Sequence, residues 1–347
     1  MDYQVGLVNL GNTCFLNSCI QVLQRIYELH TLFDQKPDVL QKPDVILIRE
    51  WNELRKTMQT QNGILSPNRF VHMVQQMAKQ KQRDLFTGWA QNDMSEFLLF
   101  LVECMHNSIS RPLHIQINGT PENSMDTRAT ICYTMLQNIY KKDYSKVLDI
   151  FYGMYVTEIL DVDKKIVSAK PEHYFILDLQ LFTRQQTSDR TYKDIVCNNI
   201  YDCFDIFTTP EILEGENQWF NDTTQEKQTV YKQTAFWNFP DVLVIILKRF
   251  SPDGKKLQNL IEFPLEGLDL SKYVTGYKAE TYVYDLFGVC NHMGNVMGGH
   301  YTAFVKNTEN QWRHYNDQIV EEVSTREIIS PKAYCLFYRK KIPSRNI

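Results

Sequence analysis

Apolar residues recur every three or four positions through the first 110 residues of the chain, which is the period of an amphipathic helix. This spacing predicts four helices, one for each of the following sets: Leu16, Ile20, Leu23 and Tyr27; Val45, Ile48, Trp51, Leu54 and Met58; Phe70, Met73, Val74 and Met77; Phe97, Leu98, Leu101 and Met105. Ser66-Pro67 suits the start of the third, because proline is tolerated in a first turn. One further helix is expected between Thr130 and Asp149, after an exposed connection rich in Pro, Gly and Asn.

The period of the apolar pattern changes to two after Phe151, as in a β-strand with one buried face. Phe175, Leu177 and Leu179 show the alternation most clearly, and residues 229–250 predict two strands joined around Asn238-Phe239-Pro240. Further strands with short turns follow as far as Tyr338, whereas residues 193–207 fit a helix. Helices first and an antiparallel sheet afterwards predict the α+β fold class.

The composition is that of a folded globular protein. The 347 residues carry a net charge of −4 and 12% of them are aromatic, which argues against a disordered tail or a nucleic-acid-binding protein. The eight cysteines contain no C-x-x-C pair and do not resemble a disulfide framework. The first residues lack a signal-peptide pattern, and the longest apolar run, Val242–Leu247, is far too short to span a bilayer. We therefore expect a soluble monomer of the cytoplasm, with access to the nucleus, that binds neither nucleic acid nor membrane.

Cys14 is the first candidate catalytic residue. It lies where a segment rich in Gly and Asn gives way to the first predicted helix, with Asn12 or Thr13 as the N-cap. The positive end of a helix dipole lowers the pKa of a thiol there and favours the nucleophilic thiolate. A single cysteine on an amphipathic helix is more often a packing residue, so Cys14 needs a partner elsewhere in the chain.

That partner comes almost at the other end of the chain, in Gly298-Gly299-His300 and in Asn316-Asp317. His300 opens an alternating strand, and a hairpin would return Asn316 and Asp317 beside it. A catalytic cysteine needs a base, and the base needs a group that orients it. The order Cys, His, Asn/Asp is similar to that of papain-like thiol hydrolases.

These stretches resemble the Cys box and the His box of the ubiquitin-specific proteases, cysteine peptidases that cut after the C-terminal glycine of ubiquitin. Further segments are similar to motifs of that family, in the same order: residues 91–98 (QNDMSEFL), 239–250, 284–294 and 333–338 (AYCLFY). The resemblance spans Gly6 to Tyr338. It implies a papain-like α+β fold and a single catalytic domain over residues 1–347. The mainly helical thumb would cover 1–130, the fingers 150–235, and the antiparallel palm 131–149 and 236–347, with the active site between thumb and palm.

The resemblance also implies a role for each candidate. Cys14 is the nucleophile, His300 the general base, and Asn9 a donor to the oxyanion. Asn316 orients His300 and Asp317 assists; if Asp317 is the orienter instead, Asn316→Ala costs less activity than Asp317→Ala. The alternative for Asn9 is a turn-forming residue without a catalytic role.

The C-terminal tail of ubiquitin carries two arginines before its terminal glycines, so its channel needs carboxylates and a passage too narrow for side chains. By resemblance, the residues that contact the tail are Gln91, Asp93, Glu96, Phe250, His292, Gly299 and Tyr301. A solvated helix face is the alternative for Asp93 and Glu96. Residues 293–298 are similar to a loop that opens when substrate enters.

The finger region departs from the family pattern. Most members hold zinc there on two C-x-x-C pairs, because a tetrahedral structural site needs four such ligands. Here Asp161-Val162-Asp163-Lys164 and Asn221-Asp222-Thr223-Thr224 stand in the two places. We therefore expect no metal and no other cofactor.

Three functions are compatible with these residues. The leading hypothesis is a deubiquitinating thiol hydrolase that acts on ubiquitin and ubiquitinated proteins through an acyl-enzyme on Cys14. The second is a protease for another ubiquitin-like modifier, because the altered fingers weaken the case for gripping the body of ubiquitin. The third is an inactive ubiquitin-binding scaffold, which would have no chemical need for Cys14, His300, Asn316, Asp317 and Asn9 together.

Overall fold

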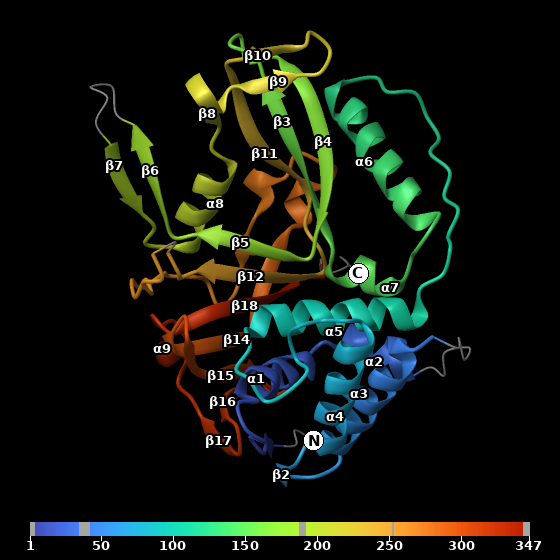
Figure 1. Ribbon diagram of the computed structural model, residues 1–347, viewed down its shortest axis with the longest axis vertical. Coiled ribbons are helices and arrows are strands. Elements are labelled where there is room, and N and C mark those ends of the chain that lie inside the picture. The colour runs from blue at the N-terminus through green and yellow to red at the C-terminus, as the bar shows by residue number, and fades with distance from the viewer. Residues whose placement is uncertain (1–3, 35–41, 187–191, 252, 343–347) are drawn as a thin grey trace, which may run out of the picture.

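The computed structural model describes residues 4–34, 42–186, 192–251 and 253–342 (Figure 1). Helices dominate the first part of the chain and strands the rest, so the predicted α+β class is confirmed. The N-terminal helices lie together against one side of the large sheet (Figure 1). They are α1 (Cys14–Leu23), α2 (Tyr27–Asp34), α3 (Asp44–Met58), α4 (Asn68–Gln80) and α5 (Met94–Ile109). No helix in the described ranges is both long and apolar enough to cross a membrane.

The apolar sets locate these helices but not all of their ends. The first set covers two helices, because α1 ends at Leu23 and Tyr27 begins α2. The helix expected over residues 130–149 is also two helices, α6 (Ser124–Tyr140) and α7 (Lys146–Phe151). The Ser145 side chain caps α7 by accepting a hydrogen bond from Val147 N, which starts a new helix where the apolar period alone shows no break.

The large sheet crosses the middle of the molecule. Its strands lie in the order β17-β16-β15-β14-β18-β12-β5, and β13 pairs with β14. Their bounds are β5 (Ile176–Gln180), β12 (Val242–Lys248), β13 (Leu268–Asp269), β14 (Val283–Asn295), β15 (Gly298–Lys306), β16 (Trp312–Asn316), β17 (Ile319–Glu322) and β18 (Ala333–Lys340). The pairs are antiparallel except that β5 runs parallel to β12, so the sheet expected to be antiparallel is mixed at one edge.

Strand β12 is buried on both faces, which explains its uninterrupted apolar sequence. Val242, Val244 and Ile246 belong to the core shared with α1 to α5. Leu243, Ile245 and Leu247 belong to a second core on the other face. That core is closed by α8 (Ile200–Thr208), the helix expected within residues 193–207, and by the short α9 (Thr325–Ile328). Strand β5 joins this sheet although the sequence placed it in the fingers, because Leu177 and Leu179 are buried in the second core.

A second, four-stranded sheet extends beyond the large one, at the top of Figure 1. Its order is β4-β3-β11-β8, with bounds β3 (Gly153–Leu160), β4 (Ile166–Tyr174), β8 (Glu211–Leu213) and β11 (Val230–Asn238). Helix α6 packs on it through a small core that includes Cys132, Val156 and Trp237. The remaining strands form three pairs: β1 (Val5–Leu7) with β2 (Gly63–Leu65), β6 (Phe182–Gln186) with β7 (Tyr192–Val196), and β9 (Trp219–Asn221) with β10 (Glu226–Gln228).

Candidate active site

The segment before Cys14 is fixed against the turn that follows β16. Leu7 N donates a hydrogen bond of 2.8 Å to the carbonyl oxygen of Asp317. A side chain at Gly6 would collide with the backbone of Gln318, so only glycine allows the two segments to come this close. Strand β1 is thereby placed beside the turn that follows Asn316 and beside β17, although some 300 residues separate them.

Cys14 is the first residue of α1, and its side chain is buried. Burial raises the pKa of its thiol, and the charge of Asp317 raises it further, while backbone N–H groups led by that of Tyr301 oppose the rise. The N–H groups of Cys14 and Phe15 at the helix terminus do lower this pKa, as expected, but desolvation outweighs them, so the expected net lowering was wrong. A base that removes the proton is correspondingly more important.

His300 and Asn316 face each other across the β15–β16 hairpin. Their ring Nε2 and side-chain Oδ1 lie 2.7 Å apart. Because an amide oxygen only accepts, this contact assigns the proton to Nε2 and leaves the lone pair on Nδ1. In the described residues no hydrogen bond joins Cys14 Sγ to the His300 ring; such catalytic contacts often tighten only when substrate binds.

Asp317 contacts two asparagines rather than His300. Its Oδ2 accepts a hydrogen bond of 2.9 Å from Asn9 Nδ2, and its Oδ1 accepts one of 2.8 Å from Asn17 Nδ2. Its backbone φ of 49° lies in the left-handed region, where Asn and Asp are tolerated better than other side chains. Of the two residues that the sequence left open as orienter of the histidine, Asn316 is the one that meets the ring.

The side chain of Asn9 is held at both ends. Its Oδ1 accepts hydrogen bonds from Gly11 N (3.0 Å) and Thr13 N (3.1 Å), while Nδ2 donates to Asp317. A carboxamide nitrogen carries two protons, so one N–H remains beyond the bond to Asp317. Asn9 thus shapes the turn before Cys14, as the alternative interpretation held, and also has a donor left over.

Asp93 lies among aromatic side chains at the start of α5. Its Oδ1 accepts from Ser95 N at 2.7 Å, which makes it the N-cap of that helix. Its Oδ2 accepts from the hydroxyls of Tyr301 (3.1 Å) and Tyr334 (2.8 Å). The carboxylate and burial together raise the pKa values of both tyrosines, which keeps them protonated as donors. Each carboxylate oxygen of Asp93 therefore already has partners within the protein.

His292 lies beside this group and is buried. Its ring is 5.5 Å from that of Phe250 and 4.7 Å from that of Tyr301. Lys256 Nζ lies 3.1 Å from His292 Nδ1 and 2.6 Å from its carbonyl oxygen. Burial, and next the charge of Lys256, lower the pKa of His292 to about 4. The imidazole is therefore neutral at neutral pH, and its Nδ1 accepts a hydrogen bond from the Lys256 ammonium group.

Glu96 and Gln91 differ from Asp93 in their surroundings. Glu96 lies in the first turn of α5 and is exposed, with no hydrogen-bond or ion-pair partner among the described residues. The Gln91 side chain instead bonds the backbone of Gly299, directly before His300. The segment expected to be a mobile loop, residues 293–298, is largely strand, since Gly294 pairs with Gly299 at the end of the β14–β15 hairpin.

Polar side chains close the two turns, at residues 161–164 and 221–224, where the resemblance had led us to look for zinc-binding cysteines. Asp161 Oδ1 accepts a hydrogen bond of 2.9 Å from Lys165 N. Asn221 Oδ1 accepts one of 2.9 Å from Thr223 N. Among the residues that the structure describes, no group of three or more His, Cys, Asp and Glu could hold a metal ion.

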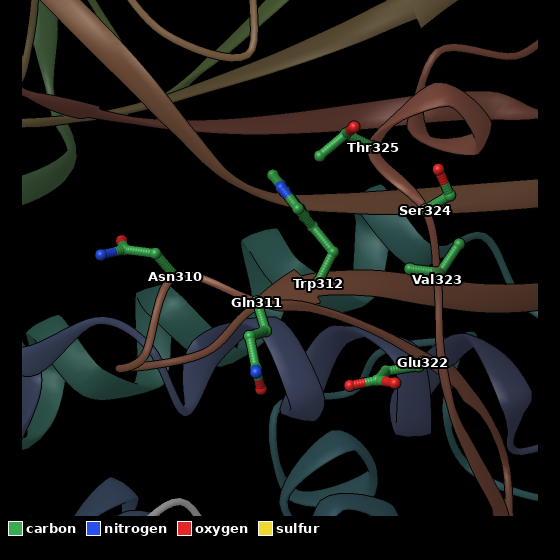
Figure 2. A pocket seen from close by; sticks show the side chains of 7 residues that line it. All are labelled: Asn310, Gln311, Trp312, Glu322, Val323, Ser324 and Thr325. Atoms are coloured by element: carbon green, nitrogen blue, oxygen red, sulfur yellow. The ribbon is translucent and has the colours of Figure 1, made fainter.

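Figure 2 shows a pocket of about 350 Å³ between β16 and the start of α9. Its lining residues are Asn310, Gln311, Trp312, Glu322, Val323, Ser324 and Thr325. Trp312 is at the opposite end of β16 from Asn316, so the pocket contains none of the candidate catalytic residues.

Three residues of this site were not predicted from the sequence: Asn17, Lys256 and Tyr334. Asn17 lies one turn after Cys14 on the same helix, so its distance along the chain could have indicated it. Lys256 reaches His292 from the segment after β12, and Tyr334 of β18 reaches Asp93 at the start of α5, so both contacts join segments far apart in the chain. No local pattern marks them.

Comparison with known proteins places this geometry in a family. The family model described as ubiquitin carboxyl-terminal hydrolase matches residues 5–338. The chain is 30% identical to Ubiquitin carboxyl-terminal hydrolase 2 of Homo sapiens over 353 residues, covering 97% of this chain and 55% of that protein. It is 31% identical to Ubiquitin carboxyl-terminal hydrolase 21 of Bos taurus over 365 residues, covering 96% of this chain and 61% of that protein.

Among solved structures, the SAGA Ubp8/Sgf11/Sus1/Sgf73 DUB module bound to ubiquitin aldehyde has a similar fold. The TM-score is 0.68 at 22% identity, with 97% of this chain and 69% of that chain covered. The chain spans only somewhat more than half the length of these two relatives. Since the family model covers nearly all of the chain, the protein belongs to the ubiquitin carboxyl-terminal hydrolase family, in its ubiquitin-specific protease type.

Proposed function

We propose that this chain is a deubiquitinating thiol hydrolase that cleaves peptide and isopeptide bonds after the C-terminal glycine of ubiquitin. The observation that carries the proposal is the 2.7 Å contact between His300 Nε2 and Asn316 Oδ1, on strands that pack against the start of the Cys14 helix. Membership of the family and the names of its relatives support the substrate class.

In the proposed reaction the thiol of Cys14 loses its proton to Nδ1 of His300. The thiolate sulfur attacks the carbonyl carbon of the terminal glycine, and the carbonyl electron pair moves onto oxygen. When the tetrahedral intermediate collapses, the C–N bond breaks and His300 gives its proton to the leaving amine. Water then attacks the thioester, with His300 again as the base, and releases the ubiquitin carboxylate and the Cys14 thiol.

Asn316 and Asn9 act on different parts of this reaction. Asn316 Oδ1 accepts a hydrogen bond from Nε2–H of His300, which leaves the lone pair of His300 on Nδ1, on the side of the ring away from Asn316. The same hydrogen bond stabilises the imidazolium that forms during the reaction. The N–H of Asn9 that is not bonded to Asp317 donates to the oxyanion, together with backbone N–H groups near Cys14. Asp317 supports the reaction through Asn9, whose amide it holds in place.

For the ubiquitin tail we propose contacts along the start of α5 and the β14–β15 hairpin. Within the described part of the chain Glu96 has no hydrogen-bond or ion-pair partner, and it suits an arginine of the tail. Asp93, Phe250, His292 and Tyr301 shape the wall of the channel through the contacts described above. Gln91 and Gly299 lie at its inner end, next to His300.

The remaining parts of the proposal concern the whole protein. The described residues work as one catalytic domain with thumb, fingers and palm, as a monomer in the cytoplasm. The protein needs no metal or other cofactor and has ubiquitin and ubiquitinated proteins as partners. The capped finger turns at Asp161 and Asn221 support a zinc-free finger region.

Hydrolysis of ubiquitin carrying a C-terminal fluorogenic amide tests the activity. The purified chain should release the fluorophore, and Cys14→Ala should abolish the release. Cys132→Ala, which changes a buried thiol on α6 outside the site, is the matched control and should keep the activity. Tight binding of ubiquitin without turnover would support the inactive scaffold, and turnover of another modifier alone would change the substrate.

A further inference from the structure

Gln91 forms a two-way contact with the residue directly before His300. Its Nε2 donates a hydrogen bond of 3.1 Å to Gly299 O, and its Oε1 accepts one of 2.9 Å from Gly299 N. A weaker bond of 3.4 Å runs from Nε2 to Asn12 Oδ1, two residues before Cys14. One side chain therefore connects the loop that precedes the nucleophile with the strand that carries the base.

This contact takes the place of a missing strand. On one side, the first half of β15 pairs with β14, with Gly299 opposite Gly294. On its other side, β16 pairs with β15 only from Ala303 onward. The backbone groups of Gly299 that face away from β14 would have no ladder partner. The Gln91 carboxamide offers one donor and one acceptor, as a neighbouring strand residue would.

The sequence around Gly299 is adapted to this arrangement. A Cβ atom at Gly298 would collide with Gln91 Oε1, so a side chain there would expel the carboxamide. The next residues toward the tip of the hairpin, Val296 and Met297, are exposed. Gln91 therefore supplies hydrogen bonds to the hairpin close to its tip. The residues at the tip are exposed and contribute little packing of their own.

We propose that the role of Gln91 is to position His300 rather than to bind the ubiquitin tail. The inference rests on the proposed hydrolase function. By fixing both backbone groups of Gly299, the carboxamide sets the start of β15, while Asn316 sets the direction of the His300 ring. Loss of the carboxamide allows His300 to move relative to Cys14. It removes no charged side chain that could bind the arginines of the ubiquitin tail.

Two variants of Gln91 test this proposal. Gln91→Met keeps the length of the side chain and removes both hydrogen bonds. Gln91→Glu keeps the acceptor for Gly299 N and removes the donor to Gly299 O. The matched control is Gln137→Met. Gln137 lies on α6, outside the site, and its half-buried carboxamide donates a hydrogen bond of 2.8 Å to Ile115 O. Thermal melting identifies a variant that does not fold, in which case the other Gln91 variant carries the test.

The measurements are kcat with ubiquitin fluorogenic amide, and Kd for ubiquitin in a Cys14→Ala background. We expect Gln91→Met to lower kcat about ten- to a hundredfold, since a small misplacement of a catalytic group is that costly, with Kd unchanged. Gln91→Glu should also lower kcat, because it sets a carboxylate oxygen against Gly299 O, and Gln137→Met should match the wild type. A raised Kd with unchanged kcat would make Gln91 a substrate contact and overturn the proposal, as would no change in either. A wild-type chain without turnover would instead refute the hydrolase function itself.

Discussion

Replacing Asp317 by Asn separates the two roles that the site assigns to neighbouring residues. Asp317 accepts from Asn9 and from Asn17, one with each carboxylate oxygen, and has no contact with the His300 ring among the described residues. An Asn side chain has one acceptor oxygen, so it can serve only one of the two amides. Its φ of 49° is tolerated by Asn, so the backbone should remain in place.

The size of the effect follows from the bond that is lost. A hydrogen bond to a charged group contributes about 1.5–3 kcal/mol, which corresponds to about a ten- to 150-fold change in rate when it orients a transition-state donor. We therefore expect kcat/KM for ubiquitin amide hydrolysis to fall by that factor in Asp317→Asn. Complete removal of the donor in Asn9→Ala should cost about a hundred- to a thousandfold.

Alkylation of Cys14 by iodoacetamide, followed by mass spectrometry, provides the second readout. This displacement forms no oxyanion, so it does not use Asn9. The negative charge of Asp317 raises the pKa of the Cys14 thiol, and removing it should lower that pKa. At a fixed neutral pH, alkylation of Asp317→Asn should therefore be as fast as in the wild type or faster, while hydrolysis is slower.

The matched control is Asp285→Asn, which changes a carboxylate on β14 that accepts from Gly267 N at 2.8 Å, outside the site. It should leave both rates unchanged. If Asp317→Asn slows alkylation as much as hydrolysis, Asp317 acts through His300, and the assignment of Asn316 as orienter is refuted.

Four further outcomes are expected. Asn316→Ala should slow both hydrolysis and Cys14 alkylation and shift the acidic limb of the pH–rate profile, since it removes the 2.7 Å contact to His300; an unchanged alkylation rate would contradict this. Arg128→Ala should lower the free energy of unfolding by up to about 3 kcal/mol in urea titration, because the fully buried Glu158 loses its ion pair and, among the described residues, keeps Gln233 as its partner. Arg69→Ala, which removes an exposed arginine from its ion pair with the half-buried Glu50, should cost less than about 1 kcal/mol. Burial lowers the pKa values of His173 and His292 from the ordinary 6.5 to about 4, so the unfolded state binds more protons than the folded state between these pH values. The free energy of unfolding should therefore decrease as pH falls from about 6.5 to about 4, and a constant value across that window would be inconsistent with the burial of the two rings. Elemental analysis of chain purified without chelator should find no stoichiometric zinc, and one zinc per chain would overturn the description of the fingers.

The catalytic strands could be anticipated because they are close in sequence. Sixteen residues separate His300 from Asn316, and a glycine pair, an alternating strand and a return strand are enough to predict a hairpin that brings them together. Val242–Leu247 was likewise recognisable as a strand, because a short apolar run has the length of a strand buried on both faces.

What the sequence could not give depends on contacts between distant segments. The pKa of Cys14 is set by how deeply the sheet buries it, and no property of its own helix shows that. Asp93 resembles an acid free to meet arginine, yet tyrosines from β15 and β18 occupy its Oδ2. Strand β5 alternates as a strand should, but its parallel pairing with β12 depends on residues that lie 68 positions further along the chain.

The central claim is that Cys14 attacks the end of ubiquitin. The most direct measurement is the reaction of the purified chain with ubiquitin that carries a thiol-reactive group at its C-terminus, beside Cys14→Ala and the same probe built on another modifier. The account predicts a covalent adduct with the ubiquitin probe, attached at Cys14 and absent from the variant. An adduct only with the other modifier would contradict the substrate, and no adduct with either probe would contradict the chemistry.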